Sequence, residues 1–458
     1  MKLDVCIAIA AAKLSRFAIN LLGRGGTAMP GKIALKICPD LLKHLAKDVQ
    51  TIVVTGTNGK TTTSRMLEKT FKDMGVSYIA NRSGANLHSG IVTEFALNST
   101  LGGKVNADYA VIECDEAAAR HSFPQLNPKV VVVTNLFRDQ LDRFGEVTTT
   151  LSLIKEAIAK IPDARICLNA DCSLTASLAE MLPNTAFFFG IDASAGLRSE
   201  EPTSTDAPRC IKCKTPYKYD YSTFAHLGGF RCPECGYARR KCDVAVTKIC
   251  ESTLDGTSVL FRINDEEAEA TINLPAVYNI YNAAAAVTAL TVMDMPREAI
   301  FSGLATFSCG FGRMEKFNIG KIGAKMMLVK NPAGCNQVID FLSLMPYEYE
   351  LIVLLNDREG DGTDVSWIWE CNFEKLAKQP QLYSVTVSGI RAKDMYLRCK
   401  YAGIDENNIT LEPNYALLAQ KVSEMERPCF IIPTYTAMLG FRSELVKLSG
   451  GADFWEEQ

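Results

Sequence analysis

A glycine-rich turn that carries a lysine lies between a short apolar run and a helical pattern. The run Thr51–Val54 leads into a turn that reads Gly-Thr-Asn-Gly-Lys-Thr-Thr, and apolar residues at helical spacing follow it. In this order of strand, turn and helix, backbone N–H groups and the positive end of the helix face an anion. Lys60 would reach the β- and γ-phosphates of a nucleotide, and the Thr61 hydroxyl would ligate Mg²⁺. The candidate nucleotide-binding residues of the turn are Gly56, Thr57, Asn58, Gly59, Lys60, Thr61 and Thr62. A turn without a ligand is the alternative, but packing alone hardly explains two glycines, a lysine and so many threonines.

An acidic run ends a second apolar strand pattern. Glu113, Asp115 and Glu116 follow the apolar residues after Tyr109. A carboxylate at this point, facing the phosphate turn, is the expected second anchor for Mg²⁺. The pattern alone does not separate the three carboxylates, and any of them could instead be solvated.

Two Cys-x-x-Cys pairs interrupt the chain between about residues 205 and 240. They are Cys210 with Cys213 and Cys232 with Cys235, and 18 residues rich in Tyr, Gly and Phe separate the pairs. This spacing is typical of a zinc ribbon in which four thiolates close a tetrahedral Zn²⁺ site. Because such a site leaves no position for a substrate, we expect the zinc to be structural. The metal would replace a core that about 40 residues cannot build alone.

The phosphate turn resembles the ATP loop of the Mur ligase superfamily, which includes the folylpolyglutamate synthases. Val54 stands where the general P-loop pattern has its first glycine, and the six-residue motif is specific to this superfamily. Its members join an amine to a carboxylate through an acyl phosphate made from ATP. The resemblance implies ATP and Mg²⁺ as cofactors, and it implies that Glu113, rather than Asp115 or Glu116, anchors the Mg²⁺.

Two further residues gain a role from the same resemblance. The helical segment with Asn279 and Asn282 resembles the superfamily helix whose second asparagine contacts adenine, which implies Asn282. Arg313 lies in Gly-Arg-x-Glu at an expected hinge between domains, where it would swing onto the phosphates of ATP. A guanidinium suits charge that develops on a transferring phosphoryl group. A surface arginine in a loop is the alternative for Arg313.

The chain departs from the superfamily at three histidine positions, where it has Gln140, Tyr278 and Lys330 instead. Gln140 stands where the ligases have a metal-binding histidine, so an ordinary second-metal site is not expected. Lys155 lies near the position of a lysine that many Mur ligases carbamylate, although an exposed helix lysine is the default interpretation. Lys330, in Lys-Asn-Pro, occupies another histidine position. The amino-acid-accepting second domain is therefore expected to be rebuilt for a different task.

A tryptophan pair beside an acidic, glycine-rich loop indicates what that task is. Trp367 and Trp369 follow the sequence Asp-Gly-Thr-Asp-Val-Ser, a combination that suits a partner surface better than a core. With the ribbon and Lys-Asn-Pro-Ala-Gly, this block resembles the MurT family, the synthetase subunits of lipid II isoglutaminyl synthase, over essentially the whole chain. The resemblance implies amidation of the D-glutamate α-carboxylate in the lipid II stem peptide, with ammonia from a GatD-like glutaminase. It also implies an aspartate that completes the Cys-His pair of that partner, and Asp364 is our choice over Asp357 and Asp361.

These side chains need a scaffold of alternating strands and helices. Apolar runs at 52–55, 109–113, 130–134, 165–169 and 186–190 predict an α/β, parallel, doubly wound sheet with its ligand at the carboxyl ends of the strands. Strands at 244–249 and 257–263 and a helix at 275–290 are expected to rejoin it. A second, Rossmann-like α/β unit would use strands at 325–329, 351–355, 384–387 and 430–433. We expect an N-terminal helix and glycine-rich lead-in at 1–50, an ATP-binding domain at 51–310 with the ribbon inserted, and a C-terminal domain at 311–458 that closes over ATP and docks the glutaminase.

Composition sets the remaining limits. The 458 residues carry 47% hydrophobic and 22% charged residues and a net charge of −3, which describes a globular protein without a broad attraction for nucleic acid. Sixteen cysteines are too sparse for a disulfide scaffold, and we expect a reduced, cytoplasmic protein. The N-terminal helix carries Ile7, Ala11, Leu14, Phe17 and Leu21 on one stripe. We expect that stripe to pack under the first domain, and shallow contact of the stripe with a membrane is the alternative. Otherwise we expect the protein to meet the membrane only through its substrate.

Two other functions stay open from the sequence. One is a Mur or folylpolyglutamate ligase that uses an amino acid as its nucleophile and needs no glutaminase. The other is a nucleic-acid-binding ATPase with a zinc ribbon, since Arg231, Arg239, Arg240 and Lys241 cluster near the ribbon. Because the ribbon interrupts a ligase-like domain, we favour a role in stabilising the fold or in contacting a partner protein.

Overall fold

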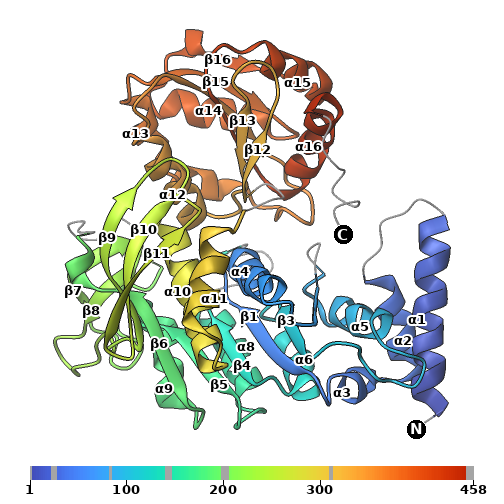
Figure 1. Cartoon of the computed structure of the whole chain (residues 1–458). Coiled ribbons are helices and arrows are strands. Elements are labelled where there is room, and N and C mark those ends of the chain that lie inside the picture. Colours follow the sequence, from blue (N-terminus) through green and yellow to red (C-terminus); the bar gives the residue numbers. More distant parts are fainter. Residues whose placement is uncertain are drawn as a thin grey trace. The chain divides into compact units, whose positions relative to one another are not determined.

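A computed structural model describes residues 3–21, 28–81, 85–139, 147–196, 206–308 and 313–449. The chain divides into two compact units, which are described separately (Figure 1). Unit 1 comprises residues 1–137 and 147–307. Unit 2 comprises residues 138–146 and 308–458.

A nine-stranded sheet is the framework of unit 1, with the strand order β11-β10-β9-β6-β5-β4-β1-β3-β2. The seven strands β9, β6, β5, β4, β1, β3 and β2 run parallel to one another. Strands β10 and β11 extend the sheet beyond β9 in antiparallel fashion at one edge. The strands are β1 (Gln50–Thr55), β2 (Tyr78–Ala80), β3 (Tyr109–Glu113), β4 (Val130–Val133), β5 (Arg165–Asn169), β6 (Ala186–Ile191), β9 (Val244–Ser252), β10 (Thr257–Ile263) and β11 (Glu266–Ile272). The prediction of a parallel α/β sheet is confirmed, and the antiparallel extension is an addition to it. Strand β11 escapes prediction because it is a polar edge strand with largely exposed residues.

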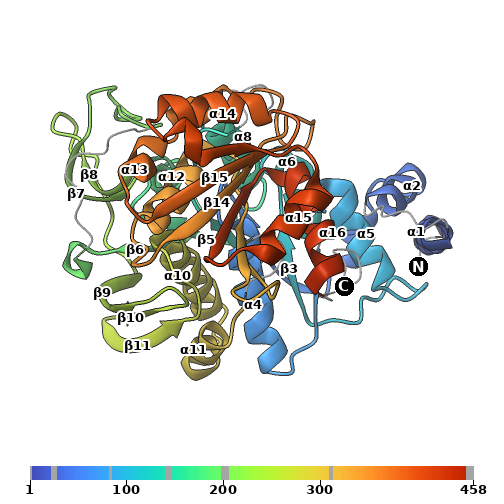
Figure 2. The same cartoon turned by 90° about the horizontal axis from the view of Figure 1, so that it is seen from above.

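Helices cover both faces of this sheet (Figures 1 and 2). Helix α4 contacts β1 and β3 and packs against α10 and α11, while α6 and α8 pack together on the other face. The helices of unit 1 are α1 (Leu3–Leu21), α2 (Met29–Ile37), α3 (Leu41–Leu45), α4 (Lys60–Asp73), α5 (His88–Leu97), α6 (Ala119–Leu126), α8 (Val147–Ile158), α9 (Ser173–Met181), α10 (Val277–Val292) and α11 (Arg297–Ala305), with the 3₁₀ turn η1 (Ala193–Ala195). The central strands are buried on both faces, and this explains their unbroken apolar runs such as Val130–Val133.

The N-terminal helix α1 packs through a different face from the one we predicted. Its buried residues are Val5, Ala8, Ile9 and Ala12, which face α2 and α5. Two alanines in this face allow the helices to approach closely, and Val5 and Ile9 fill the rest of the interface. The expected packing stripe is therefore wrong: Ile7, Leu14, Phe17 and Leu21 are exposed, and Ala11 is only half-buried.

The cysteine-rich insertion forms a separate hairpin on unit 1. Strands β7 (Lys218–Phe224) and β8 (Leu227–Arg231) make a two-stranded antiparallel sheet between β6 and β9 in the chain. Its small core packs Tyr217, Phe230 and Tyr237 against Ala176 of α9. The hairpin is thus attached to the helical layer of unit 1.

Unit 2 is a smaller α/β unit built on a six-stranded sheet, with the order β12-β13-β17-β14-β15-β16. All neighbours run parallel except β12 and β13. Its elements are β12 (Arg313–Phe317), β13 (Ala324–Met327), α12 (Pro332–Leu342), β14 (Tyr349–Leu354), η2 (Ser366–Glu370), α13 (Phe373–Ala377), β15 (Leu382–Ser388), α14 (Ala392–Tyr401), η3 (Glu406–Asn408), β16 (Ile409–Leu411), α15 (Tyr415–Glu424), β17 (Cys429–Pro433) and α16 (Tyr435–Ser449). Helices α15 and α16 cover Met326, Ile352 and Ile431 of the central strands.

Among the described segments, none of the helices combines the length and the apolar character that crossing a bilayer requires.

Candidate active site

The phosphate turn joins β1 to α4 in a conformation that only glycine tolerates well. Gly56 and Gly59 have φ angles of +115° and +89°. A Cβ on Gly56 would lie 2.8 Å from the carbonyl oxygen of Asn135, and one on Gly59 would lie 2.1 Å from Oδ1 of Asn282. Both glycines are therefore required by backbone angle and by close approach. The turn is pressed against the end of β4 on one side and against α10 on the other.

The segment after β4 fixes the middle of the turn. The Thr57 N–H donates to the Asn135 carbonyl (2.9 Å), and the Asn58 N–H donates to Oδ1 of Asn135 (3.0 Å). The Thr134 hydroxyl donates to the Asn58 carbonyl at 2.7 Å. These bonds hold the turn rigidly at the carboxyl end of the sheet, where parallel α/β folds bind their ligands.

Lys60 opens α4 and is almost completely buried. Its ammonium group donates to the Gly56 carbonyl (2.5 Å) and to the Glu116 carboxylate (3.0 Å). Burial disfavours the charge, but the acidic run outweighs that cost, with Glu116 the strongest contributor, and the pKa of Lys60 is raised. Lys60 therefore stays protonated inside the turn, which is the charge state that binding of a phosphate would require.

Thr61 lies beside the first residue of the acidic run. The Thr61 hydroxyl donates to Oε2 of Glu113 at 2.8 Å. Asn81 fixes Glu113 from behind, because its amide accepts from the Glu113 N–H (2.8 Å) and donates to the Glu113 carbonyl (2.7 Å). A hydroxyl and a carboxylate side by side are oxygen ligands of the kind that Mg²⁺ prefers. The donor set therefore fits a magnesium ion.

The two rival carboxylates lie elsewhere. Glu116 pairs with Lys60, and Oδ1 of Asp115 accepts from the Ala117 N–H (3.0 Å) in the turn before α6. Of the three carboxylates, Glu113 is the one that the structure places on Thr61. Sequence reasoning treats Glu116 only as a rival for magnesium and misses it as the partner of Lys60.

Helix α10 carries both candidate asparagines, and both are buried. The Asn282 amide donates to Oδ1 of Asn279 (3.2 Å), and the Asn279 amide donates to the Pro275 carbonyl (2.7 Å). The Thr63 hydroxyl donates to the Asn282 backbone carbonyl at 3.4 Å, and Thr62 is buried next to it on α4. Asn282 therefore lies against the phosphate turn, with its side chain oriented by Asn279.

A buried network that sequence reasoning misses connects α10 to the hairpin. The Tyr281 hydroxyl donates to the Asp171 carboxylate (2.5 Å) and is 2.8 Å from the Thr223 hydroxyl on β7. The other oxygen of Asp171 accepts from Arg239, at 2.5 Å, just after the second cysteine pair. Burial and the Asp171 carboxylate raise the pKa of Tyr281 well above its usual value, so the hydroxyl stays neutral and donates. No local pattern signals this network, because its members lie far apart in the chain.

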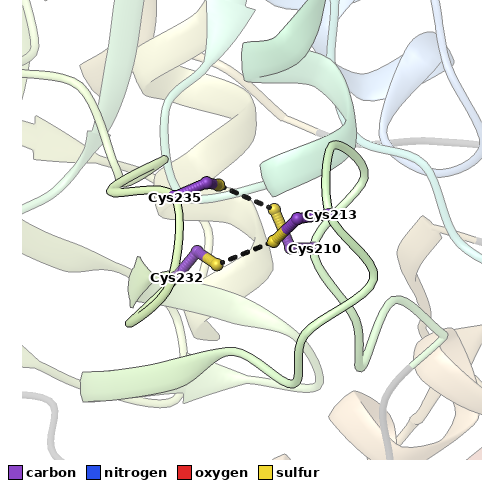
Figure 3. Close-up of side chains that lie close together, drawn as sticks. All are labelled: Cys210, Cys213, Cys232 and Cys235. Carbon is purple, nitrogen blue, oxygen red and sulfur yellow. Dashed lines mark hydrogen bonds between the residues drawn. The ribbon is translucent and has the colours of Figure 1, made fainter.

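The four cysteines converge on one point (Figure 3). All four sulfur atoms lie within 4.8 Å of one another, with Cys210 and Cys235 3.6 Å apart and Cys213 and Cys232 3.3 Å apart. Four sulfurs on one tetrahedral zinc, at bonds of about 2.3 Å, would be about 3.8 Å apart. The thiols are free rather than paired in disulfides. The donor set and its spacing fit a structural zinc ion.

The two cysteine pairs have the same backbone geometry. The N–H of Lys214 donates to the Cys210 carbonyl, and the N–H of Gly236 donates to the Cys232 carbonyl. Lys214 and Gly236 take matching left-handed φ angles of +66° and +71°. Each cysteine pair is thus presented by an equivalent turn, as expected where two knuckles share one metal.

The basic residues after and within the hairpin are paired with acids. Arg231 pairs with Asp220 (2.9 Å), Arg239 with Asp171 and Asp192, Arg240 with Glu180 (2.5 Å), and Lys241 with Asp265 (3.1 Å). A nucleic-acid site presents an excess of positive charge to the phosphate backbone. These four residues do not provide such an excess.

In unit 2, Arg313 begins β12 and is half-buried. The hinge residues 309–312 lie outside the described residues. Glu315, the acid of Gly-Arg-x-Glu, forms a buried ion pair with Arg442 of α16 at 2.9 Å. The last part of the motif therefore has a structural role that the sequence does not reveal.

Three aspartates near η2 differ clearly in their surroundings. Asp361 is buried and accepts from the Thr436 N–H (2.7 Å) and hydroxyl (2.5 Å), and Asp357 pairs with Arg391 at 3.2 Å. Asp364 is exposed, and its Oδ1 accepts from the Ser366 N–H at 2.8 Å. Of the three, Asp364 presents its carboxylate most openly.

An aromatic surface begins at η2, directly after Asp364 in the chain. Trp369 is 52% exposed, and its ring contacts Tyr401 edge-on, with a centroid distance of 5.8 Å. Arg398 lies over the Trp369 ring at 5.5 Å, and Trp367 is half-buried. The exposed Trp–Tyr pair has the composition of a protein-binding surface, whereas Arg398 is buried and donates to the backbone carbonyls of Ile368 and Cys371.

The structure describes two of the residues that bear on the Mur ligase resemblance, Lys330 and Lys155. Lys330 pairs with Asp139 at 2.5 Å, and Asn331 caps α12 by accepting from the Gly334 N–H at 2.9 Å. Lys155 lies exposed on α8, in agreement with its interpretation as a surface lysine. Gln140 lies outside the described residues.

Comparisons with known proteins agree with this geometry. Residues 54–216 match the family described as Mur ligase middle domain, and residues 328–438 match the family described as MurT ligase C-terminal. The sequence is 36% identical over 446 residues to the lipid II isoglutaminyl synthase (glutamine-hydrolyzing) subunit MurT of Streptococcus pneumoniae, covering 97% of this chain and 98% of that protein. The corresponding subunit of Staphylococcus aureus is 34% identical, with 96% and 97% covered.

Solved structures share the fold at lower identity. A pseudomurein peptide ligase type C from Methanothermus fervidus superimposes with a TM-score of 0.65 at 22% identity, covering 89% of this chain and 80% of that chain. Mycobacterium tuberculosis folylpolyglutamate synthase superimposes with a TM-score of 0.59 at 13% identity, covering 98% and 96%. The MurT subunits are more than 30% identical to this chain along nearly its whole length, and its C-terminal part matches the MurT ligase family. The chain therefore belongs to the MurT family.

Proposed function

We propose that this chain amidates the D-glutamate α-carboxylate of the lipid II stem peptide to D-isoglutamine during peptidoglycan synthesis. ATP supplies the phosphoryl group that turns the carboxylate into an acyl phosphate with release of ADP. Ammonia then displaces the phosphate to leave the carboxamide. The observation that carries the proposal is the buried Lys60 in a rigid phosphate turn beside the Thr61–Glu113 pair, in a chain of the MurT family.

The residues of unit 1 would act mainly by positioning and by charge. Backbone N–H groups at the start of α4 and the Lys60 ammonium would hold the phosphates, and the Thr61 hydroxyl and the Glu113 carboxylate would hold Mg²⁺. Asn282 would contact the adenine. These groups are fixed before substrate arrives, so little reorganisation is needed as charge develops on the transferring group.

Unit 2 would supply the remaining functions. Arg313 would bind the phosphates when the domains close, and the residues from about 311 onwards would dock a GatD-like glutaminase that provides ammonia. Asp364 would complete the Cys-His pair of that partner, and its exposure supports this role. Asp361 and Asp357 are weaker candidates, because their carboxylates are already engaged by Thr436 and Arg391. The zinc ion would stabilise the hairpin and take no part in the reaction, since four thiolate ligands leave no coordination position for a substrate.

One assay tests the proposal. The chain is purified with its glutaminase partner and given lipid II, ATP and Mg²⁺, with either glutamine or ammonium chloride as nitrogen source. We expect one ADP per D-isoglutamine formed with both sources, and ammonia-driven amidation by the chain without its partner. An amide bond to an added amino acid would favour the amino-acid ligase, and ATP hydrolysis stimulated by nucleic acid without a carboxamide would favour the nucleic-acid ATPase.

A further inference from the structure

Helix α1 has two apolar faces, and the one that faces solvent carries the larger side chains. The buried face consists of Val5, Ala8, Ile9 and Ala12, against α2 and α5. The opposite side carries Leu3, Ile7, Leu14, Phe17 and Leu21, which are between 48% and 77% exposed. In both views α1 lies at the margin of unit 1, beyond α2 and α5 (Figures 1 and 2).

The exposed residues, which we call the α1 stripe, form a continuous line. At 3.6 residues per turn, Leu3, Ile7, Leu14, Phe17 and Leu21 fall within an arc of about 80°, and they extend over about 27 Å of helix. Scattered single apolar residues are normal on a surface, but a contiguous line of large ones marks an interaction site. Folding of unit 1 does not explain it, because the smaller face already satisfies the packing.

The charge of the N-terminal segment indicates the kind of surface that the stripe meets. Residues 1–50 contain eight lysines and arginines and three aspartates, an excess of five positive charges in a chain whose net charge is −3. Lys32 and Lys36 lie exposed on α2, next to α1, together with Met29 and Ile37. An apolar stripe within a basic segment complements a bilayer surface with anionic headgroups.

We propose that the α1 stripe lies in the interface of an anionic membrane and holds the enzyme at the bilayer. Leu3, Ile7, Leu14, Phe17 and Leu21 enter the boundary between headgroups and acyl chains, and the exposed Lys32 and Lys36 of α2 face the headgroup phosphates. The choice of a membrane over a second copy of the chain rests on the proposed function, because a lipid-linked substrate places the reaction at a bilayer. Membrane contact is then direct and does not depend on the substrate alone.

Vesicle flotation with the full chain tests this without any lipid II. One set of vesicles contains phosphatidylcholine alone, and the other contains phosphatidylcholine with phosphatidylglycerol. The variant Leu14→Gln/Phe17→Gln removes two exposed side chains, and Leu344→Gln/Leu448→Gln is a matched control from exposed leucines of unit 2. Burying two such side chains contributes a factor of about ten or more to partitioning.

We expect the wild type and the unit 2 control to float with phosphatidylglycerol vesicles, and the stripe variant to lose at least about ten-fold in bound fraction. Added salt should weaken binding, because part of it is electrostatic. Circular dichroism and thermal unfolding of the stripe variant should match the wild type. Equal binding by the stripe variant, or no flotation of the wild type, would overturn the proposal. So would a dimer in solution that the stripe variant converts to a monomer, because the stripe would then join two copies.

An activity comparison separates this inference from the proposed function. With lipid II in phosphatidylglycerol vesicles, the stripe variant should amidate several-fold more slowly than the wild type, and with a short-chain, water-soluble lipid II analogue the two should be equal. Vesicle binding without amidation would reject the proposed function and keep the membrane contact. Amidation without vesicle binding would support the proposed function and reject the membrane contact.

Discussion

At the scale of single residues, the buried pair of Lys60 and Glu116 explains how a phosphate turn stays charged. The ammonium group is held by the Glu116 carboxylate and by the Gly56 carbonyl. A nucleotide phosphate would add to these contacts or replace the carbonyl. Removal of the lysine would also leave Glu116 buried without its strongest partner, so activity and stability are expected to change together.

We predict that Lys60→Ala lowers ammonia-driven amidation by about 100-fold or more, because an interaction with the transferring phosphoryl group is lost. The measurement is the rate of D-isoglutamine formation from lipid II, with thermal unfolding recorded in parallel. Lys69→Ala is the matched control, since Lys69 lies on the same helix and pairs with Asp73 on the surface. Amidation by Lys60→Ala at the rate of Lys69→Ala would contradict the assignment of the turn.

The exposed carboxylate of Asp364 leads to a second prediction. Asp364→Asn should reduce glutamine-driven amidation by at least about ten-fold and leave ammonia-driven amidation unchanged, because only the partner's histidine would need the carboxylate. The two nitrogen sources are compared in the same preparation of the complex.

Asp405→Asn serves as the control for Asp364→Asn. Asp405 is also exposed in unit 2, and its Oδ1 accepts from the N–H two residues later at 3.0 Å, in the same kind of turn before a 3₁₀ helix. It should retain both activities. Equal loss of both activities in Asp364→Asn would exclude a triad role.

At the scale of elements, the hairpin of β7 and β8 is held at two places. One is the cysteine cluster, and the other is the set of contacts that the aromatic core makes with α9. About 40 residues with two strands bury little apolar surface, so the metal is expected to contribute much of the local stability.

We predict that Cys232→Ser, or removal of zinc with a chelator, lowers the melting temperature of unit 1 by about 5 °C or more. Zinc content by mass spectrometry and calorimetry would be measured together. Cys250→Ser is the control, because Cys250 is exposed on β9 of the same unit and lies outside the cluster. A metal-free protein that melts like the zinc-containing one would rule out the structural role.

The network of Asp171, Tyr281 and Arg239 couples this hairpin to the helix that carries Asn282. In Tyr281→Phe the Asp171 carboxylate loses one donor, which should cost about 1–3 kcal/mol of stability. Because Tyr281 is adjacent to Asn282, we also expect a several-fold increase in KM for ATP with a smaller change in kcat.

Tyr278→Phe is the control for that variant, since it lies on the same helix and is only half-buried. Calorimetry and steady-state kinetics over a range of ATP concentrations check both effects. A loss of stability without any change in KM for ATP would show that the network supports the fold alone.

At the scale of the whole molecule, each of the two units has its own sheet and its own core. A core cluster among the described residues of unit 2 includes Met326, Ile352 and Phe441. Units of this kind are expected to unfold as separate cooperative transitions.

We therefore predict two transitions in calorimetry, of which zinc removal shifts only one. Glu315→Ala should lower the stability of the unit that gives the other transition by about 3–5 kcal/mol, because it breaks the buried Glu315–Arg442 ion pair. Glu348→Ala is the control, since its pair with Arg427 has the same length of 2.9 Å but lies exposed. A single transition that both changes shift equally would contradict independent units.

Patterns that are local in the chain can be recognised from the amino-acid sequence alone. The phosphate turn, the four cysteines and most central strands are predicted, some with identical bounds such as Tyr109–Glu113 and Thr257–Ile263. Buried parallel strands read as unbroken apolar runs, and glycines in a turn and paired cysteines need no distant partner to be recognised. The edge strands β2, β11, β12 and β16 are missed, because short or polar edge strands have little apolar pattern.

Local residue types and spacings thus predict the candidate chemistry: a phosphate turn, a four-thiol cluster and a scaffold of parallel strands. The tertiary structure decided which partner each charged group has. It placed Glu116 on Lys60 and Glu113 on Thr61, and it left Asp364 exposed while burying Asp361. It also turned the face of α1 with Val5, Ala8, Ile9 and Ala12 inward. Such choices depend on contacts between segments far apart in the chain. Spacing along one segment carries no information about them.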